Sequence, residues 1–294
     1  MAVAIPYVRE IQFEYGEADQ VSPLIRRVVA NNPSAFTFTG TGTYIIGEGE
    51  VAVIDPGPMI DTHIEALLRA LEGETVSHIL ITHTHSDHSP AAAPLKKLTG
   101  ALTYGYGRHG GGKGEEDGDM SFVPDVEIRH GDIIEGDGWT VECVHTPGHT
   151  SNHICFALQE EKALFTGDHV MGWSTSIVSP PDGNMFDYMN SLRLLLERDD
   201  ETYWPTHGAP IRDPRPFVKS YIAHREEREA QIIEQITAGH HHIKEMVPII
   251  YAAVDKRLYP AAARSVYAHI LGMVTDGRIT VDGQATIDAS YRLA

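Results

Sequence analysis

A loop rich in metal-binding side chains follows a short apolar run, and this feature constrains the chain most. Residues 82–89 read Thr-His-Thr-His-Ser-Asp-His-Ser, and the apolar run before them predicts a buried strand. Because side chains alternate along an extended segment, His83 and His85 lie on one side of the backbone. Asp87 and His88 turn the other way as a helix begins. One loop can therefore present two neighbouring sets of ligands, which favours a metal site over a solvated polar turn.

Three further candidate ligands occur later in the chain, each in a loop just past a strand-like run. Each is next to a glycine, which lets the backbone approach a crowded centre. These candidates are His149, Asp168 and His207. Together with the four side chains of the first loop they make five imidazoles and two carboxylates. Such a set of nitrogen and oxygen ligands suits two zinc ions, with iron or manganese as substitutes.

The length of 294 residues indicates one large domain with a small appendage. There is no apolar run of about 18 residues that could span a membrane, and the N-terminus lacks the pattern of a signal peptide. Cys143 and Cys155 lie in strand-like apolar runs, so we expect buried free thiols in a reducing compartment. These features are typical of a cytoplasmic enzyme.

The whole chain has a formal net charge of −18, and the negative charge is concentrated in its first part. Residues 1–214 carry 13 Lys and Arg against 32 Asp and Glu, whereas residues 215–294 carry ten against nine. An acidic body repels polyanions at long range. A nucleic-acid substrate is therefore disfavoured, and a small-molecule substrate is favoured.

Residues 1–214 are expected to form the catalytic domain. Strands alternate with helices, and polar residues cluster where strands end, which indicates sheets covered by helices. The helical segments are 60–71, 90–98 and 185–197. The strand-like segments begin after a short N-terminal stretch and are 36–46, 51–54, 76–81, 101–104, 132–134, 139–144, 154–158, 163–166 and 203–204.

Residues 215–294 change character and are expected to form a small winged-helix-like unit. The predicted elements are helices over 217–235, 243–251 and 261–275 and a hairpin from 277–283 and 285–291. The near-neutral charge of this unit argues against reading of DNA. Closing over the catalytic domain, or mediating a homodimer, is the favoured role.

A glycine-rich segment, residues 105–118, lies between two strand-like runs. Gly107, Gly112 and Lys113 match the first part of a phosphate-binding loop, but Gly114 stands where a Ser or Thr must bind magnesium. The segment is therefore predicted to be a mobile surface loop near the mouth of the site.

The motifs resemble those of the metallo-β-lactamase superfamily. The signature His-x-His-x-Asp-His stands at residues 83–88, followed in the expected order by Thr-Pro-Gly-His-Thr at 146–150, Phe-Thr-Gly-Asp at 165–168 and Pro-Thr-His-Gly at 205–208. The resemblance covers residues 35–210 and implies an αββα sandwich, of class α+β, with metals at one edge. The winged-helix-like tail and the Gly-Thr-Gly-Thr-Tyr segment at 40–44 resemble the branch that contains β-lactamase-like protein 2. That branch includes an endoribonuclease and polyketide-type thioesterases.

The resemblance implies two metal positions that share one bridging residue. The first is held by His83, His85 and His149. The second is held by Asp87, His88 and His207, with Asp168 as the bridge. Zinc lowers the pKa of bound water to about 7, so a bridging hydroxide can attack an acyl carbonyl or a phosphorus. Asp87 is placed to orient or take up a proton, which makes it the candidate general acid or base.

Other histidines near these motifs are expected to have structural roles. His145, His153 and His169 neighbour the ligands in sequence and are expected to pack beside them. The triplet at residues 240–242 is expected to cap a helix rather than to form a further metal site.

The favoured function is hydrolysis of a small acyl substrate, such as a thioester or a lactone. Tyr44 and Trp173 are weak candidates for contacts with that substrate, although core packing explains both equally well. An endoribonuclease or phosphodiesterase is the alternative that the branch resemblance favours. A mononuclear-iron persulfide dioxygenase and a non-catalytic winged-helix binding protein are further alternatives. A serine hydrolase is disfavoured, because Gly172–Ser176 lacks the final glycine of a nucleophile elbow.

Overall fold

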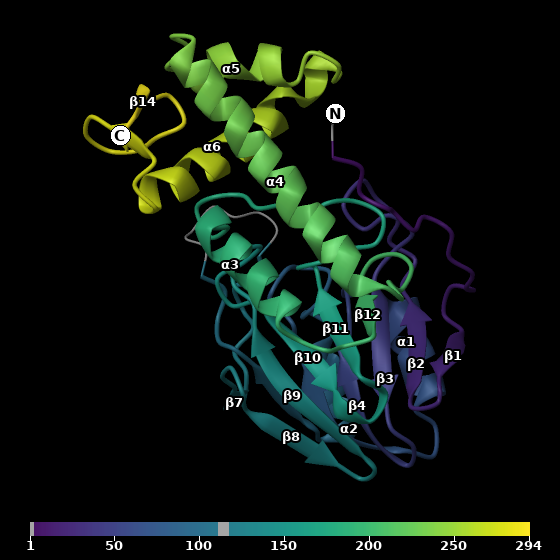
Figure 1. The fold of residues 1–294 in the computed structure, drawn as a ribbon. Helices are drawn as coiled ribbons and strands as arrows, with labels where there is room; N and C mark the ends of the chain where they lie inside the picture. Colours follow the sequence, from purple (N-terminus) through teal and green to yellow (C-terminus); the bar gives the residue numbers. More distant parts are fainter. Residues whose placement is uncertain (1–2, 111–117) are drawn as a thin grey trace.

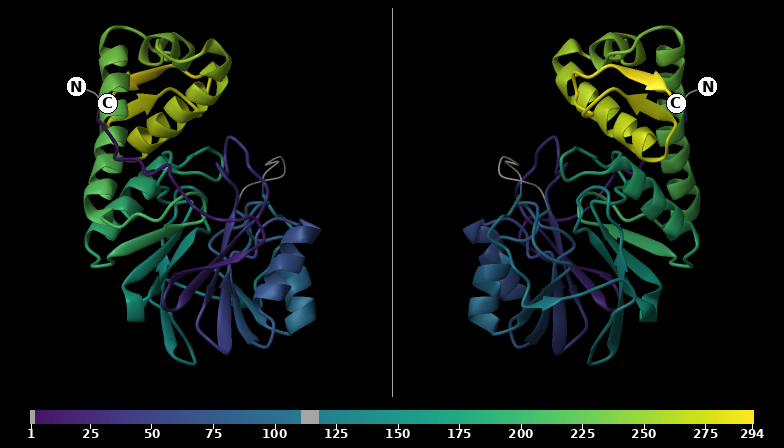
Figure 2. Two further views of the ribbon diagram at one scale, coloured as in Figure 1. Left: turned by 90° about the vertical axis from the view of Figure 1, so that its right-hand side faces the viewer. Right: turned by 90° about the vertical axis from the view of Figure 1, so that its left-hand side faces the viewer.

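Two β-sheets are stacked face to face, with helices on the outer face of each (Figure 1). The computed structural model describes residues 3–110 and 118–294. A helical unit with a small hairpin lies over one end of the sandwich, and both orthogonal views agree on this placement (Figure 2). The predicted α+β class, with an αββα sandwich and a winged-helix-like C-terminal unit, is confirmed.

The first sheet has seven strands and contains the strand that leads into the histidine loop. Strands β1 to β4 pair antiparallel with their neighbours, and β4 to β7 pair parallel. In sheet order the strands are β1 (Ala18–Ser22), β2 (Ile25–Val29), β3 (Gly42–Ile46), β4 (Glu50–Ile54), β5 (Thr75–Leu80), β6 (Leu102–Gly105) and β7 (Val126–Glu127).

The N-terminal strands β1 and β2 and the short β7 have no counterpart in the sequence-based prediction. Strand β2 carries two consecutive arginines, which interrupt the apolar alternation that marks a strand. Arg27 is only 4% exposed and pairs with Asp19 of β1 at 3.6 Å. The predicted strand over 36–46 is too long, because only Gly42–Ile46 enters the sheet and the residues before it form turns.

The second sheet has five strands, and each coincides with a predicted strand-like segment. All neighbours are antiparallel except β11 and β12, which are parallel. In sheet order the strands are β12 (Thr202–Pro205), β11 (Ala163–Gly167), β10 (Ile154–Leu158), β9 (Trp139–His145) and β8 (Ile133–Gly136). A 3-10 turn, η1 (Gln159–Glu161), connects β10 to β11.

The packing of the layers follows from the alternation of side chains along the strands. On β10, Phe156 points into the apolar layer between the sheets, whereas Cys155 and Ala157 point toward the helices outside. The second sheet is covered by α3 (Met185–Leu196) and α4 (Pro214–Thr237), and the first by α1 (Asp61–Ala70) and α2 (Ala92–Thr99) (Figure 2). Both cysteines are buried and free, as expected.

The C-terminal unit has an apolar core of its own, to which the end of α4 contributes Ile232 and Ile236. Its elements are α5 (Ile243–Ile250), η2 (Lys256–Leu258), α6 (Tyr259–Thr275), β13 (Ile279–Val281) and β14 (Tyr291–Leu293). The three predicted helices are confirmed, and His242 caps α5 together with Glu245, as expected for the histidine triplet.

The second strand of the predicted hairpin is misplaced in the sequence-based prediction. The sequence predicts it over 285–291, but β14 begins only at Tyr291, which pairs with Val281. The backbone N–H of Ala289 donates to the carbonyl oxygen of Thr286 at 3.0 Å and closes a turn inside the predicted strand. Among the described residues, no helix is both long and apolar enough to cross a membrane.

Candidate metal centre

The candidate ligands meet because the strands before them end at the same edge of the sandwich. Strands β4 and β5 are parallel in the first sheet, and β9, β11 and β12 run in one direction in the second. At this edge the two sheets are joined by backbone hydrogen bonds, from Ile154 N to Thr82 O at 2.8 Å and from Gly42 N to Thr206 O at 2.8 Å. Loops that follow these strands therefore converge on one place.

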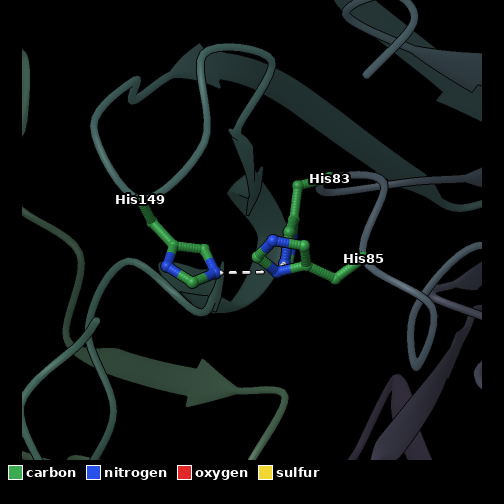
Figure 3. A group of neighbouring side chains, drawn as sticks. All are labelled: His83, His85 and His149. Atoms are coloured by element: carbon green, nitrogen blue, oxygen red, sulfur yellow. Dashed lines mark hydrogen bonds between the residues drawn. The ribbon is translucent and has the colours of Figure 1, made fainter. Parts of the chain in front are cut away.

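His83, His85 and His149 form the first set of candidate ligands (Figure 3). The Nε2 atom of His83 lies 2.9 Å from Nδ1 of His85, and Nε2 of His149 lies 3.1 Å from the same Nδ1. Zinc–nitrogen bonds of about 2.0–2.1 Å in a tetrahedron place neighbouring ligand nitrogens about 3.4 Å apart. The three nitrogens are thus slightly closer than in a loaded site, and their convergence fits a single cation.

Asp87, His88 and His207 form the second set of candidate ligands. The Oδ2 atom of Asp87 lies 3.1 Å from Nε2 of His207 and 3.5 Å from Nε2 of His88. Both imidazoles are almost fully buried, whereas the Asp87 side chain is 22% exposed. This set therefore has one ligand at the solvent side and two beneath it.

The carboxylate of Asp168 lies between the two sets. Its Oδ1 atom is 3.3 Å from Nε2 of His207 and 3.7 Å from Nε2 of His88, and its Oδ2 atom is 3.7 Å from Nε2 of His149. Among the described residues, Asp168 Oδ1 and His88 Nε2 are buried polar atoms without a hydrogen-bond partner. Such atoms are costly to bury unpaired, and a cation between them removes that cost. The donor set thus fits two cations that share Asp168.

A surrounding layer of hydrogen bonds orients the imidazoles. Nδ1 of His149 donates to the carbonyl oxygen of Ile177 at 2.5 Å, and Nδ1 of His207 donates to that of Gly40 at 3.1 Å. Nδ1 of His88 donates to Asp55 Oδ2 at 2.8 Å. A proton held on Nδ1 leaves Nε2 as the ligand atom that faces inward in these three imidazoles.

Asp55 is a functional residue that the sequence motifs do not reveal. It follows β4, has a φ of 47°, and its side chain is almost fully buried. Its carboxylate accepts hydrogen bonds from the Thr82 N–H at 2.8 Å, the Thr82 hydroxyl at 2.7 Å and the Thr206 hydroxyl at 3.1 Å. It thereby joins both sheets beneath the centre. The available signal was its position at the end of a strand, the same position that marks the candidate ligands.

Burial and nearby charges shift the imidazole pKa values in opposite directions in the two sets. Burial lowers the pKa of His83 well below its ordinary value and that of His85 to about 3. Burial acts in the same direction on His207, but the carboxylates of Asp168 and Asp87 outweigh it and raise the pKa of His207 to about 10. The pKa of His88 is also raised, because Asp87, Asp168 and Asp55 outweigh its burial. Without metal, the nearby carboxylates therefore favour the charged form of both imidazoles in the second set.

The other sequence candidates take the structural positions expected of them. His145 stacks on Tyr106 with 3.7 Å between ring centroids, and His169 packs against Tyr188. Nε2 of His153 accepts a hydrogen bond from the backbone N–H of Asp168 at 3.2 Å, which helps to fix that residue. Within the described residues, none of these three histidines belongs to a group of side chains that could hold a metal.

Of the two weak candidates for substrate contacts, only Trp173 lies beside the centre. Tyr44 is 2% exposed, packs between the sheets and donates to the carbonyl oxygen of Pro205 at 2.7 Å, so its role is in the core. The ring of Trp173 stacks on Phe38 with 4.9 Å between centroids and lies against Gly208, next to His207.

Half of the predicted mobile loop, residues 111–117, lies outside the described residues, and this half includes Gly112, Lys113 and Gly114 of the partial phosphate-binding match. The chain beyond it returns to the centre. Gly118 forms an isolated bridge with His85, and the N–H of Asp119 donates to the carbonyl oxygen of Thr84 at 2.7 Å.

Zinc binding to the metal-free protein is expected to release at least two protons near pH 7.5, because His88 and His207 must lose theirs to become ligands. His83 and His85 are already neutral at this pH, since their pKa values are lowered. Calorimetric titration in two buffers of different ionisation enthalpy measures the release. Identical binding enthalpies in both buffers would contradict this electrostatic division.

Comparison with known proteins places the chain in a family. Residues 37–207 match the Metallo-beta-lactamase superfamily, and residues 243–288 match the Beta-lactamase associated winged helix domain. Since neither match reaches residues 208–242, the boundary expected between residues 214 and 215 stays a prediction.

Relatives and solved structures agree with these matches. An atrochrysone carboxyl ACP thioesterase, dmxR1, from Cryptosporiopsis sp. (strain 8999) is 34% identical over 75% of this chain and 65% of its own length, so the match spans less than two thirds of that protein. A beta-lactamase-like protein 2 homolog from Drosophila melanogaster is 30% identical over 88% of this chain and 90% of its own.

A crystal structure of a beta-lactamase domain protein from Burkholderia ambifaria has a TM-score of 0.79 and covers 99% of this chain and 97% of its own, at 19% identity. That likeness shows the fold alone. Taken with the family matches, the geometry leads to one conclusion: the chain belongs to the metallo-β-lactamase superfamily of metal-dependent hydrolases and carries the β-lactamase-associated winged helix domain.

Proposed function

We propose that this protein is a dinuclear-metal hydrolase of small acyl substrates, with a thioester as the favoured substrate and a lactone as the related one. The observation that carries the proposal is the Asp168 carboxylate, whose two oxygens face different sets of imidazoles. A mononuclear iron centre, as in a persulfide dioxygenase, does not require a second set of ligands such as Asp87, His88 and His207.

In this proposal His83, His85 and His149 hold one cation, and Asp87, His88 and His207 hold the other, with Asp168 shared between them. Five imidazoles and two carboxylates suit zinc, with iron or manganese as substitutes. When bound, such a pair of cations supplies a water activated at neutral pH and stabilises the negative charge that develops on a carbonyl oxygen.

Asp87 is the proposed proton-handling residue of the chain. It is the most exposed of the candidate carboxylates, and the hydroxyl of Thr41 donates to its Oδ2 at 3.3 Å. Burial alone would raise the pKa of Asp87, but His88 and His207 outweigh it and hold this pKa below its usual range. A carboxylate of low pKa is a weak base. Its proposed work is therefore to orient the attacking water and to relay a proton from that water to the leaving group.

The choice of an acyl substrate has two supports. Relatives that match this chain are named atrochrysone carboxyl ACP thioesterases. Residues 1–214 carry an excess of 19 negative charges, which repels the backbone of RNA at long range. Both supports favour a thioester over the phosphodiester that an endoribonuclease would cleave.

The substrate class is tested with the zinc-loaded full chain against acyl-CoA thioesters, lactones and labelled single-stranded RNA in parallel. Thioester hydrolysis is expected, with loss after chelation and recovery when zinc is added back. RNA cleavage without thioester or lactone hydrolysis would replace the proposal with the endoribonuclease alternative. One iron per chain together with oxygen uptake would replace it with the dioxygenase.

Removing the shared carboxylate tests the metal arrangement. Asp168→Ala is expected to bind less than two zinc ions per chain and to lower kcat/KM for a thioester at least ~100-fold, because both sets lose a ligand. Asp199→Ala is the matched control, since the Asp199 side chain is 91% exposed and, in the part of the chain that the structure describes, forms an ion pair only with Lys162, at 3.8 Å. Metal content is measured by elemental analysis of both variants. Full metal content in Asp168→Ala would argue against a shared carboxylate.

A further inference from the structure

We propose that Arg225, on helix α4, is a positioning residue that holds the candidate ligands His149 and Asp168 in place through the loop after β11. The inference rests on the proposed metal centre. Helix α4, which leads into the C-terminal unit, would then help to support the metal centre. Arg225 lies 49 residues after Ser176 in the sequence.

Two adjacent residues of this loop each hold one candidate ligand. The carbonyl oxygen of Ile177 accepts the hydrogen bond from His149 Nδ1 at 2.5 Å. The hydroxyl of Ser176 lies 2.5 Å from the carbonyl oxygen of Asp168 and 2.8 Å from that of His169, and its single proton serves one of them at a time. A shift of Ser176 and Ile177 would therefore move ligands of both sets together.

Arg225 holds this loop from outside. Its Nη2 donates to the carbonyl oxygen of Ser176 at 2.5 Å, and its guanidinium lies 5.3 Å from the ring centroid of Tyr188. The Tyr188 hydroxyl in turn donates to the carbonyl oxygen of His169 at 2.7 Å. One turn earlier on α4, the Tyr221 hydroxyl donates to the carbonyl oxygen of Met171 at 2.5 Å. Helices α3 and α4 thus hold the loop at His169, Met171 and Ser176.

Burying the charge of Arg225 costs free energy of folding, so this side chain does more than pack into the core. The residue is 5% exposed, and its Nε is a buried atom without a hydrogen-bond partner. Within residues 3–110 and 118–294 no carboxylate forms an ion pair with it. A buried charge without an ion pair is destabilising, and an apolar side chain of similar size would avoid the cost. The hydrogen bond to Ser176 is the specific contact that an apolar side chain cannot make.

Glu229, one turn after Arg225, ties the same helix to the C-terminal unit. It is 7% exposed, and its Oε2 accepts from Arg278 at 2.7 Å. Its Oε1 lies 3.7 Å from Nδ1 of His269, on α6. The contacts of Glu229 therefore fix the position of α4 relative to the C-terminal unit. Through Arg225, that position affects the loop that supports the metal centre.

Arg228 provides a matched control on the same helix. Its guanidinium lies 4.2 Å from the ring centroid of Tyr251, and its Nη1 donates to Gln231 at 2.7 Å. It thus shares with Arg225 the residue type, the helix and the contact with an aromatic ring. Its partners lie in α4 and next to α5, away from the loop after β11.

The test compares Arg225→Met, Arg225→Lys and Arg228→Met in the full chain, with cobalt(II) absorption spectra and with zinc affinity from competition with a chelator. Arg225→Met is expected to weaken zinc binding about 10- to 100-fold and to alter the cobalt ligand-field bands, because outer contacts orient the ligands. Arg225→Lys should recover part of the affinity, since an ammonium can donate to Ser176. Arg228→Met should bind both metals as the unaltered protein does.

Zinc affinity and a cobalt spectrum unchanged in folded Arg225→Met would overturn the inference. If Arg225→Met does not fold, Ser176→Ala takes its place, because it removes only the hydroxyl that contacts Asp168 and His169. Unchanged metal binding in Ser176→Ala would equally count against the inference. If the unaltered chain itself binds no cobalt or zinc, the proposed metal centre fails instead, so the two failures are distinguishable.

Discussion

The carboxylate of Asp168 lies between two groups of imidazoles, and most features of the catalytic fold can be understood from what is needed to place it there. Its oxygens lie 3.3–3.7 Å from ring nitrogens of His88, His149 and His207, which come from three different loops. Loops of this kind converge only if the strands before them end at one edge. The parallel pairs within each sheet, and the hydrogen bonds that join the sheets at Thr82 and Thr206, meet that condition.

Such a cluster is unfavourable without a cation, and the surrounding protein has to hold it together. In the first set, burial lowers the pKa values of His83 and His85 and favours their neutral forms, whereas Asp87 and Asp168 favour the charged form of His207 in the second. Asp55 supplies a buried carboxylate beneath His88 and receives hydrogen bonds from both sheets. The outer contacts come from the two sheets and from the loop that α4 supports, so the centre depends on several parts of the chain.

Much of the site could be predicted because its chemistry is concentrated in short motifs. The loop at 82–89 has few explanations other than metal binding, and the later ligands share their position after strands. Asp55 could not be recognised in the same way, since a single aspartate before Pro-Gly-Pro also suits an ordinary turn. Tyr44 lies in a motif that resembles part of the site, yet its alternation on β3 directs the ring into the core.

The errors in the fold arise where local pattern and tertiary pairing differ. In strand β2, Arg26 forms an ion pair with Glu74, 48 positions away, and no local window contains that partner. Residues 285–291 alternate like a strand but form a turn closed at Ala289. The link from Arg225 to Ser176 is also invisible in sequence, because it joins residues 49 positions apart on different elements.

Anomalous diffraction from crystals of the zinc-loaded protein tests the central claim most directly. The account predicts two zinc peaks about 3.5–4 Å apart, with Asp168 bound to both and His83 and His207 on different ions. A single fully occupied peak in excess zinc, with His207 and Asp87 unbound, would contradict it.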